Sequence, residues 1–195
     1  MEDPRDEYHI LPNLLPKSYA DLLEEELSKI HWYWYPSASG DVAVDPDDKN
    51  IVDAQQMQHV FIEENEAISP YAPLIQPVVW FLEKHMQMRI KNIVRVKANL
   101  LMPGRSDLDN YNIPHVDSPR DDYISMVYYV NDADGDTKIF HKTIDEGHKD
   151  LYTIAGISPK KGKAVMFKSN RFHASTPPFK ADRRIVLNFV LQPGT

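Results

Sequence analysis

Two different hydrophobic periods divide the chain. Between residues 16 and 90, two stretches carry apolar residues at helical spacing, three or four positions apart. The first follows Ser18, which is suited to cap a helix, and the second lies within Pro70–Met88. After Arg89 the period changes to two, which is the period of a half-buried strand. The pattern therefore predicts a helical support followed by a β-rich core.

The β-rich part is a succession of short strands. In the run Tyr123–Val130, Ile124, Met126 and Tyr128 share one face, and His173 is expected at the end of a strand over residues 164–167. Further strands are predicted over residues 8–16, 58–63, 94–101, 136–140, 151–157 and 184–191. Such strands, separated by Gly, Pro and Asn turns, favour a mainly β (α+β) fold: a double-stranded β-helix, or jelly roll, with supporting N-terminal helices.

Length and composition narrow the class of protein. With 195 residues and 42% hydrophobic content, we expect one domain over 1–195, with the helical support at about 16–90 and the jelly-roll core at about 91–191. No apolar run approaches the roughly 20 residues that span a bilayer, and no signal peptide is recognisable, so we expect a cytoplasmic protein without membrane contact. The absence of cysteine excludes thiol catalysis, disulfides and iron–sulfur clusters.

The charges are unevenly distributed. The net charge is −7, yet residues 151–195 carry eight Lys and Arg against Asp182 alone. These cations are either solvated turn residues or a local positive field around a site for an anionic ligand. The overall acidity argues against a broad nucleic-acid-binding face.

Two loops and one aromatic segment also have alternative interpretations. His31–Tyr35 is rich in aromatic rings, which either pack beneath the helix or pair across strands, or form a substrate platform at the rim of a site. The polar stretches Ser37–Asn50 and Arg105–Pro114 are candidates for a lid over a substrate.

The candidate chemistry lies around His115 and Asp117. Residues two apart in an extended strand share a face, so both side chains can bind one metal ion. His173 supplies a second imidazole, and a strand with Arg183 and Arg184 follows it. Two His and one carboxylate form the facial triad of non-heme Fe(II), whose open positions suit an α-keto acid and dioxygen. The far carboxylate of such a co-substrate requires a buried cation, for which Arg has the matching planar shape.

Several segments resemble the Fe(II)/2-oxoglutarate-dependent oxygenases, nearest to the prolyl-hydroxylase-like group. HVDSP followed by MVYYVND is similar to the HVDNP and IYYLN segments of the oxygen-sensing prolyl hydroxylases. Asp134–Phe140 resembles the Gly-Gly-x-x-x-Phe strand of that group, and Pro159–Phe167 leading to His173 is similar to its Pro-x-x-Gly…Phe…His strand. The resemblance covers residues 94–191.

The resemblance implies roles for individual residues. Fe(II) would be held by the two His and the Asp named above, and Tyr128 would bond the distal carboxylate of 2-oxoglutarate. Arg183 and Arg184 point to opposite faces, and the family pattern favours Arg184, with Asn188 on the same inward face. Asn99 either lines the pocket or is an ordinary outward polar residue.

The chain also departs from the oxygen-sensing relatives. Met102 stands where they have a Tyr that contacts 2-oxoglutarate, and Val186 where some members have Ser.

The implied activity is a 2-oxoglutarate-dependent dioxygenase that hydroxylates a protein or peptide side chain. Two alternatives stay open. One is oxidation of a small molecule or of a nucleic acid bound by the basic residues Lys160, Lys161, Lys163, Lys168 and Arg171. The other is a noncatalytic jelly-roll module. The sequence does not specify the oligomeric state.

Overall fold

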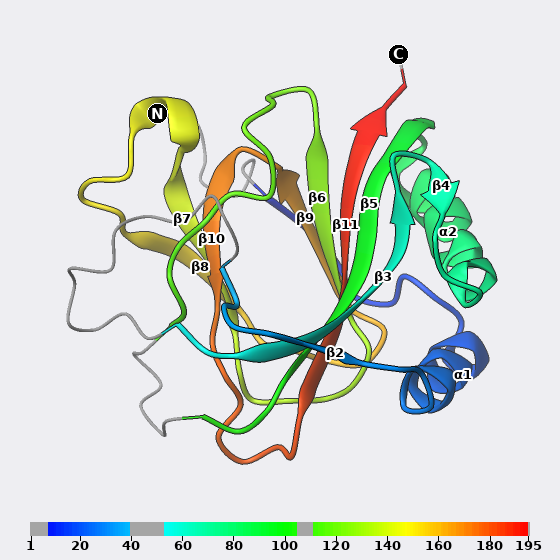
Figure 1. Cartoon of the computed structure of the whole chain (residues 1–195). Helices are drawn as coiled ribbons and strands as arrows, with labels where there is room; N and C mark the ends of the chain where they lie inside the picture. Colours follow the sequence, from blue (N-terminus) through cyan, green and yellow to red (C-terminus); the bar gives the residue numbers. More distant parts are fainter. Residues whose placement is uncertain (1–7, 40–52, 105–110, 195) are drawn as a thin grey trace.

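Two antiparallel sheets face each other in this protein, and two helices cover the outer face of the larger one (Figure 1). The computed structural model describes residues 8–39, 53–104 and 111–194. Its helices are α1 (Lys17–Leu27) and α2 (Gln76–Met86), with short 3₁₀ turns at Ala72–Leu74 and Ile144–Glu146. Its strands are β1 (Tyr8–Leu11), β2 (Tyr33–Tyr35), β3 (Gln56–Glu63), β4 (Glu66–Ala67), β5 (Ile90–Leu101), β6 (Ile124–Tyr129), β7 (Thr137–Thr143), β8 (Thr153–Ile157), β9 (Ala164–Lys168), β10 (Arg171–Ser175) and β11 (Arg184–Pro193).

The larger sheet has the strand order β1-β9-β6-β11-β5-β3-β2, with β4 paired to β3, and the smaller sheet has the order β10-β7-β8. This arrangement confirms the predicted mainly β jelly roll with supporting helices. The segment 16–90 also supplies β2 and β3, which extend the larger sheet beyond β5.

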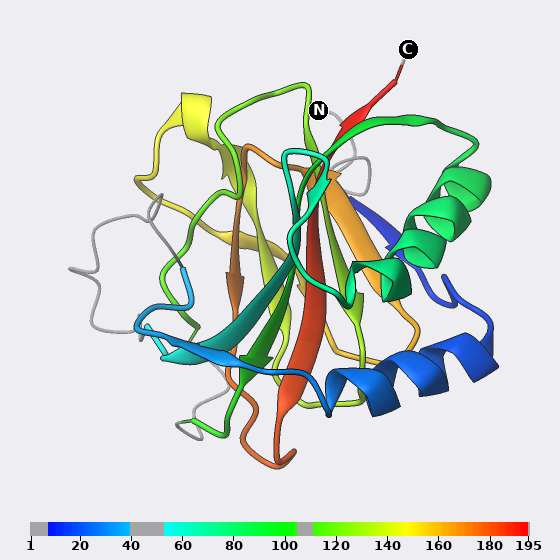
Figure 2. The same cartoon turned by 45° about the vertical axis from the view of Figure 1, so that its right-hand side comes forward.

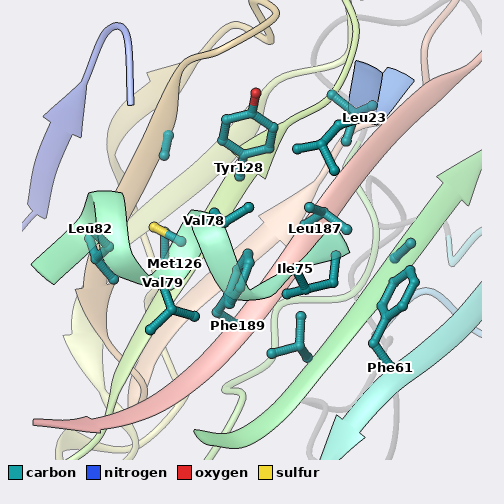
Figure 3. Close-up of a cluster of buried hydrophobic side chains, with 14 of the residues drawn as sticks. Leu23, Phe61, Ile75, Val78, Val79, Leu82, Met126, Tyr128, Leu187 and Phe189 are labelled. Carbon is teal, nitrogen blue, oxygen red and sulfur yellow. The ribbon is translucent and has the colours of Figure 1, made fainter. Parts of the chain in front are cut away.

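The main hydrophobic core lies between the helices and the larger sheet (Figure 2). Leu23 of α1 and Leu82 of α2 are fully buried there, in one cluster with Met126 of β6 and Phe189 of β11 (Figure 3). Smaller clusters fill the space between the two sheets, where Val127 and Val186 of the larger sheet meet Ile139 of β7. Burying each such side chain contributes about 1.5–3 kcal/mol.

The predicted strands do not include β2, β4 or β10, and the omission of β10 affects the site. His173 does not end the strand over 164–167, because the chain turns at Ser169 and Asn170 and starts a separate strand, β10. β9 belongs to the larger sheet and β10 to the smaller one. The turn thus carries His173 to the opposite wall of the space between the sheets.

Candidate active site

His115, Asp117 and His173 gather between the two sheets. The backbones of the two histidines form a bridge in which each N–H donates to the other carbonyl, at 3.0 and 2.9 Å. Their ring centroids are 4.4 Å apart, and Asp117 Oδ2 lies 3.6 Å from His173 Nε2. One ligand atom of each residue lies within 4.8 Å of the others, a grouping that could hold a metal ion.

The local structure that presents this group differs from the prediction in one respect. His115 and Asp117 lie outside any regular strand, in a segment that is joined to β10 by the bridge at His115 and by hydrogen bonds from Asn112 to Ser175. The N–H of Asp117 donates to the Ser169 carbonyl at 3.1 Å, so the turn between β9 and β10 also anchors the segment.

The side chains of Asp117 and His173 are only 4% and 5% exposed, and burial and neighbouring charges shift the pKa values of His115 and Asp117. Burial, reinforced by the charge of His173, lowers the pKa of His115 to about 3. For Asp117, burial alone would raise the pKa, but the charges of His173 and Arg95 and a hydrogen bond from Ser125 keep that pKa below its usual range. The site therefore holds a neutral imidazole at His115 beside an ionised carboxylate, as metal ligation requires.

Arg184 lines the same pocket and is buried. Its Nε donates to the Gly135 carbonyl at 2.8 Å and its Nη2 to Thr137 Oγ1 at 2.7 Å. Burial lowers the pKa of its guanidinium. Among the described residues the carboxylate of Asp136 lies near enough to influence Arg184, but it bonds Lys138 and Ser158 instead.

A buried guanidinium without a carboxylate partner is strongly disfavoured unless an anion accompanies it. The pocket thus has a carboxylate receptor at Arg184 and a cluster of metal-ligating groups in the same lining. These residues fit a dicarboxylate that bridges a metal ion and Arg184, which is the chemistry of 2-oxoglutarate.

The prediction that Tyr128 reaches this pocket is wrong. Tyr128 is fully buried on the other face of β6, in the core beneath the helices (Figure 3). The adjacent Tyr129 faces the site: its hydroxyl donates to Thr137 Oγ1 at 2.8 Å, and the Arg184 guanidinium lies 5.7 Å from its ring centroid. Burial raises the pKa of Tyr129 to about 12, so its hydroxyl stays a neutral donor.

The side chains of Arg183 and Arg184 point to opposite faces, as predicted for adjacent residues of a strand. Arg183 is exposed, whereas Arg184, Val186 and Asn188 line the pocket. Asn99 also lines it, and its buried Oδ1 has no hydrogen-bond partner in the described structure.

Asn188 lies on the inward face with Arg184, as expected, and Met102 stays outside the pocket. The amide of Asn188 is engaged by Asp117 and Arg95, so a contact with 2-oxoglutarate stays a prediction. Met102 is exposed, and its neighbour Leu101 lines the pocket in its place.

The aromatic segment lies beside the site. Trp34 of β2 is 59% exposed and, with Met57, Met102 and Pro103, lines a groove of about 340 Å³. Gln56 lines both this groove and the site pocket. Of the two predicted lid segments, residues 40–50 and 105–110 lie outside the described residues.

Comparisons with known proteins agree with this geometry. Residues 106–192 match the family model of the 2OG-Fe(II) oxygenase superfamily. A search of curated proteins by sequence found no match. Among solved structures, a Pseudomonas putida prolyl-4-hydroxylase is 16% identical, with a TM-score of 0.54, over 95% of this chain and 92% of its own.

Two further solved structures share the fold. A 2OG-Fe(II) oxygenase family oxidoreductase from Burkholderia pseudomallei is 14% identical, with a TM-score of 0.65, over 96% of this chain and 85% of its own. HygX from Streptomyces hygroscopicus, solved with nickel and 2-oxoglutarate and also with hygromycin B, is 11% identical, with a TM-score of 0.55, over 96% and 83%.

The family match over residues 106–192 and the shared fold show that the chain is similar to the 2OG-Fe(II) oxygenase superfamily. The matched family is that of dioxygenases dependent on Fe(II) and 2-oxoglutarate, and the grouped His115, Asp117 and His173 agree with such a site. None of the described helices is long and apolar enough to cross a membrane.

Proposed function

We propose that this chain is a hydroxylase of protein side chains in which His115, Asp117 and His173 hold the iron. The observation that carries the proposal is the position of Arg184, a buried cation without a carboxylate partner, in the same pocket as the three ligand groups. The whole chain, 1–195, would form one oxygenase domain.

The residues of the pocket would divide the work. The guanidinium of Arg184 binds the distal carboxylate of 2-oxoglutarate. Thr137 Oγ1 accepts a hydrogen bond from Arg184 and also bonds the Tyr129 hydroxyl, so it holds the guanidinium in the pocket. When bound, iron and 2-oxoglutarate supply the oxidising chemistry that inserts an oxygen atom from dioxygen into a C–H bond. The surrounding apolar residues, such as Val127 and Val186, exclude water from that chemistry.

A polypeptide substrate is supported by the surface beside the pocket. The groove at Trp34 is lined mainly by apolar groups and adjoins the site pocket, with which it shares the lining residue Gln56. β2 is the last strand of the larger sheet within the described part of the chain. An exposed sheet edge can pair with an extended peptide, and exposed Trp and Met side chains are typical of recognition surfaces. The prolyl-4-hydroxylase fold neighbour adds support for this substrate class.

The nucleic-acid alternative has less support. Arg171 is buried and donates to the carbonyls of Phe140 and His141. Lys161 forms ion pairs with Asp21 and Glu24. The basic residues proposed for such a partner thus do not form one open cationic face. A small-molecule substrate, as in the HygX structure that contains hygromycin B, is the second candidate.

Formation of succinate from 2-oxoglutarate tests the iron and co-substrate assignment. We expect iron-dependent succinate with the wild type and its loss in His173→Ala, because a facial triad without one imidazole holds Fe(II) poorly. His148→Ala, which alters an exposed histidine, is the control. Full turnover by His173→Ala would refute the assignment of the ligands.

Stimulation of succinate formation by a panel of proline-containing peptides tests the substrate class. Trp34→Ala should weaken the stimulation without changing turnover in the absence of peptide. Trp80→Ala removes a Trp of nearly equal exposure, 60%, from α2 and is the matched control. Equal effects of both variants would contradict a role of the groove.

A further inference from the structure

We propose that Arg95 and Asn188 are positioning residues that fix the orientation of the Asp117 carboxylate toward the metal. This inference rests on the proposed function, in which Asp117 is a ligand of the iron. Neither residue stood out in the sequence as a partner of Asp117.

Both oxygens of the Asp117 carboxylate are held by side chains. Arg95 Nη2 donates to Oδ1 at 3.2 Å, whereas Ser125 Oγ and Asn188 Nδ2 donate to Oδ2 at 2.6 and 3.0 Å. Oδ2 is the oxygen that lies 3.6 Å from His173 Nε2. The carboxylate is therefore held in one rotamer, with Oδ2 toward the histidine and Oδ1 toward the arginine.

Arg95 also determines how Asn188 is used. The same Nη2 that bonds Asp117 lies 3.4 Å from Asn188 Oδ1. A guanidinium only donates and a carboxylate only accepts, so a single amide orientation satisfies both neighbours. Asn188 must turn its oxygen to Arg95 and its nitrogen to Asp117. The three residues form a closed ring of hydrogen bonds in which each one sets the orientation of the next.

The donors to Asp117 lie on strands of the larger sheet, whereas the Asp117 backbone is not part of a sheet. Arg95, Asn188 and Ser125 come from β5, β11 and β6, three neighbouring strands of the larger sheet. Asp117 lies in the segment outside the strands, and its side chain is only 4% exposed. The donors on the strands thus fix the orientation of the Asp117 carboxylate, which its own irregular backbone does not fix. Outer partners of metal ligands commonly have this effect, and losing one weakens metal binding by roughly 10–100-fold.

Binding of Mn²⁺ in the presence of 2-oxoglutarate, measured by calorimetry, tests the inference without relying on turnover. We expect Arg95→Met and Asn188→Ala each to weaken Mn²⁺ binding by roughly 10-fold or more. The double variant should lose less than the sum of the two, because both changes break one ring. Arg95→Lys should stay within about threefold of the wild type, since an ammonium also offers several donors from one nitrogen. Lys91→Met, on the exposed start of β5, is the control.

Other outcomes would refute either the positioning role of Arg95 and Asn188 or the metal site itself. If Arg95 acted only by its charge, Arg95→Met would remove repulsion and bind Mn²⁺ as tightly as the wild type or more tightly, which would overturn the inference. Equal losses in Arg95→Lys and Arg95→Met, or fully additive losses in the double variant, would overturn it too. Absence of Mn²⁺ binding by the wild type, or unchanged binding by His115→Ala, would instead refute the proposed metal site. Far-ultraviolet circular dichroism of each metal-free variant verifies that it is folded.

Discussion

Tyr129 and Arg184 donate hydrogen bonds to the same oxygen, Thr137 Oγ1, at 2.8 and 2.7 Å. Tyr129 is on β6, Arg184 on the adjacent β11, and Thr137 on the opposing sheet. The shared acceptor therefore ties the two sheets together at the inner end of the pocket. The Tyr129 hydroxyl also lies 3.2 Å from the Ile157 carbonyl on β8 of the same opposing sheet.

Replacing Arg184 by Met should abolish tight binding of 2-oxoglutarate. Removing one partner of a buried charge pair costs about 2–5 kcal/mol, so we expect the Kd to rise roughly 30-fold or more. Calorimetric titration of 2-oxoglutarate into the Mn²⁺-loaded protein measures the change. Arg183→Met, which alters the exposed neighbour, should leave the Kd unaffected. A higher Kd in Arg183→Met than in Arg184→Met would assign the carboxylate to Arg183 and refute the role of Arg184.

The two adjacent tyrosines make a matched pair. Tyr129→Phe removes the donor to Thr137 and should raise the Kd for 2-oxoglutarate by about threefold to tenfold, the size of one hydrogen bond. Tyr128→Phe should leave that Kd unchanged. It should also leave the free energy of unfolding unchanged or slightly higher, because the buried Tyr128 hydroxyl has no hydrogen-bond partner in the described structure. Calorimetric titration and urea denaturation of both variants measure these effects. A higher Kd for 2-oxoglutarate in Tyr128→Phe alone would contradict the assignment of Tyr129 to the pocket.

The prediction assigned Tyr128 to the site, where the structure has Tyr129, and this error shows the limit of the information in sequence periodicity. Period two predicted that Met126 and Tyr128 share a face, and they do. It could not tell which face meets the site, because both faces of β6 are buried and apolar. Val127 and Tyr129 pack between the sheets just as Met126 and Tyr128 pack beneath the helices.

Other features of the site differ in whether neighbouring residues in the sequence could have predicted them. Strand geometry predicted that only one of Arg183 and Arg184 enters the pocket, and the family pattern, not a local signal, favoured Arg184. β10 was missed because only two residues, Ser169 and Asn170, separate it from β9. The contact of Arg95 with Asp117 spans 22 positions and joins a strand to a loop, so no local pattern marks it.

The helices stabilise the larger sheet from its outer face, and two adjacent leucines of α1 test this. Leu23 is fully buried in the main core, whereas Leu22 is 40% exposed. Leu23→Ala should lower the free energy of unfolding by about 2–5 kcal/mol, through lost burial and the cavity left behind. Leu22→Ala should change it by only about 0.5 kcal/mol. Urea denaturation measures both, and equal losses would show that α1 does not pack as described.

Asp134 links acid stability to the turn that leads into β11. Its carboxylate accepts the backbone N–H groups of Phe179 and Ala181 at 3.2 Å and of Lys180 at 2.7 Å. Partial burial acts to raise its pKa, but these three donors outweigh it, and the pKa lies below the ordinary value of 3.8. A carboxyl whose pKa is depressed by folding contributes stability that is complete above 3.8 and is lost as the pH falls through the folded-state pKa. Asp134→Asn should therefore be less stable than the wild type at pH 7, and the difference should shrink below pH 4. Urea denaturation at pH 7, 4 and 3 measures it, and a difference independent of pH would show that the charge of Asp134 does not hold the turn.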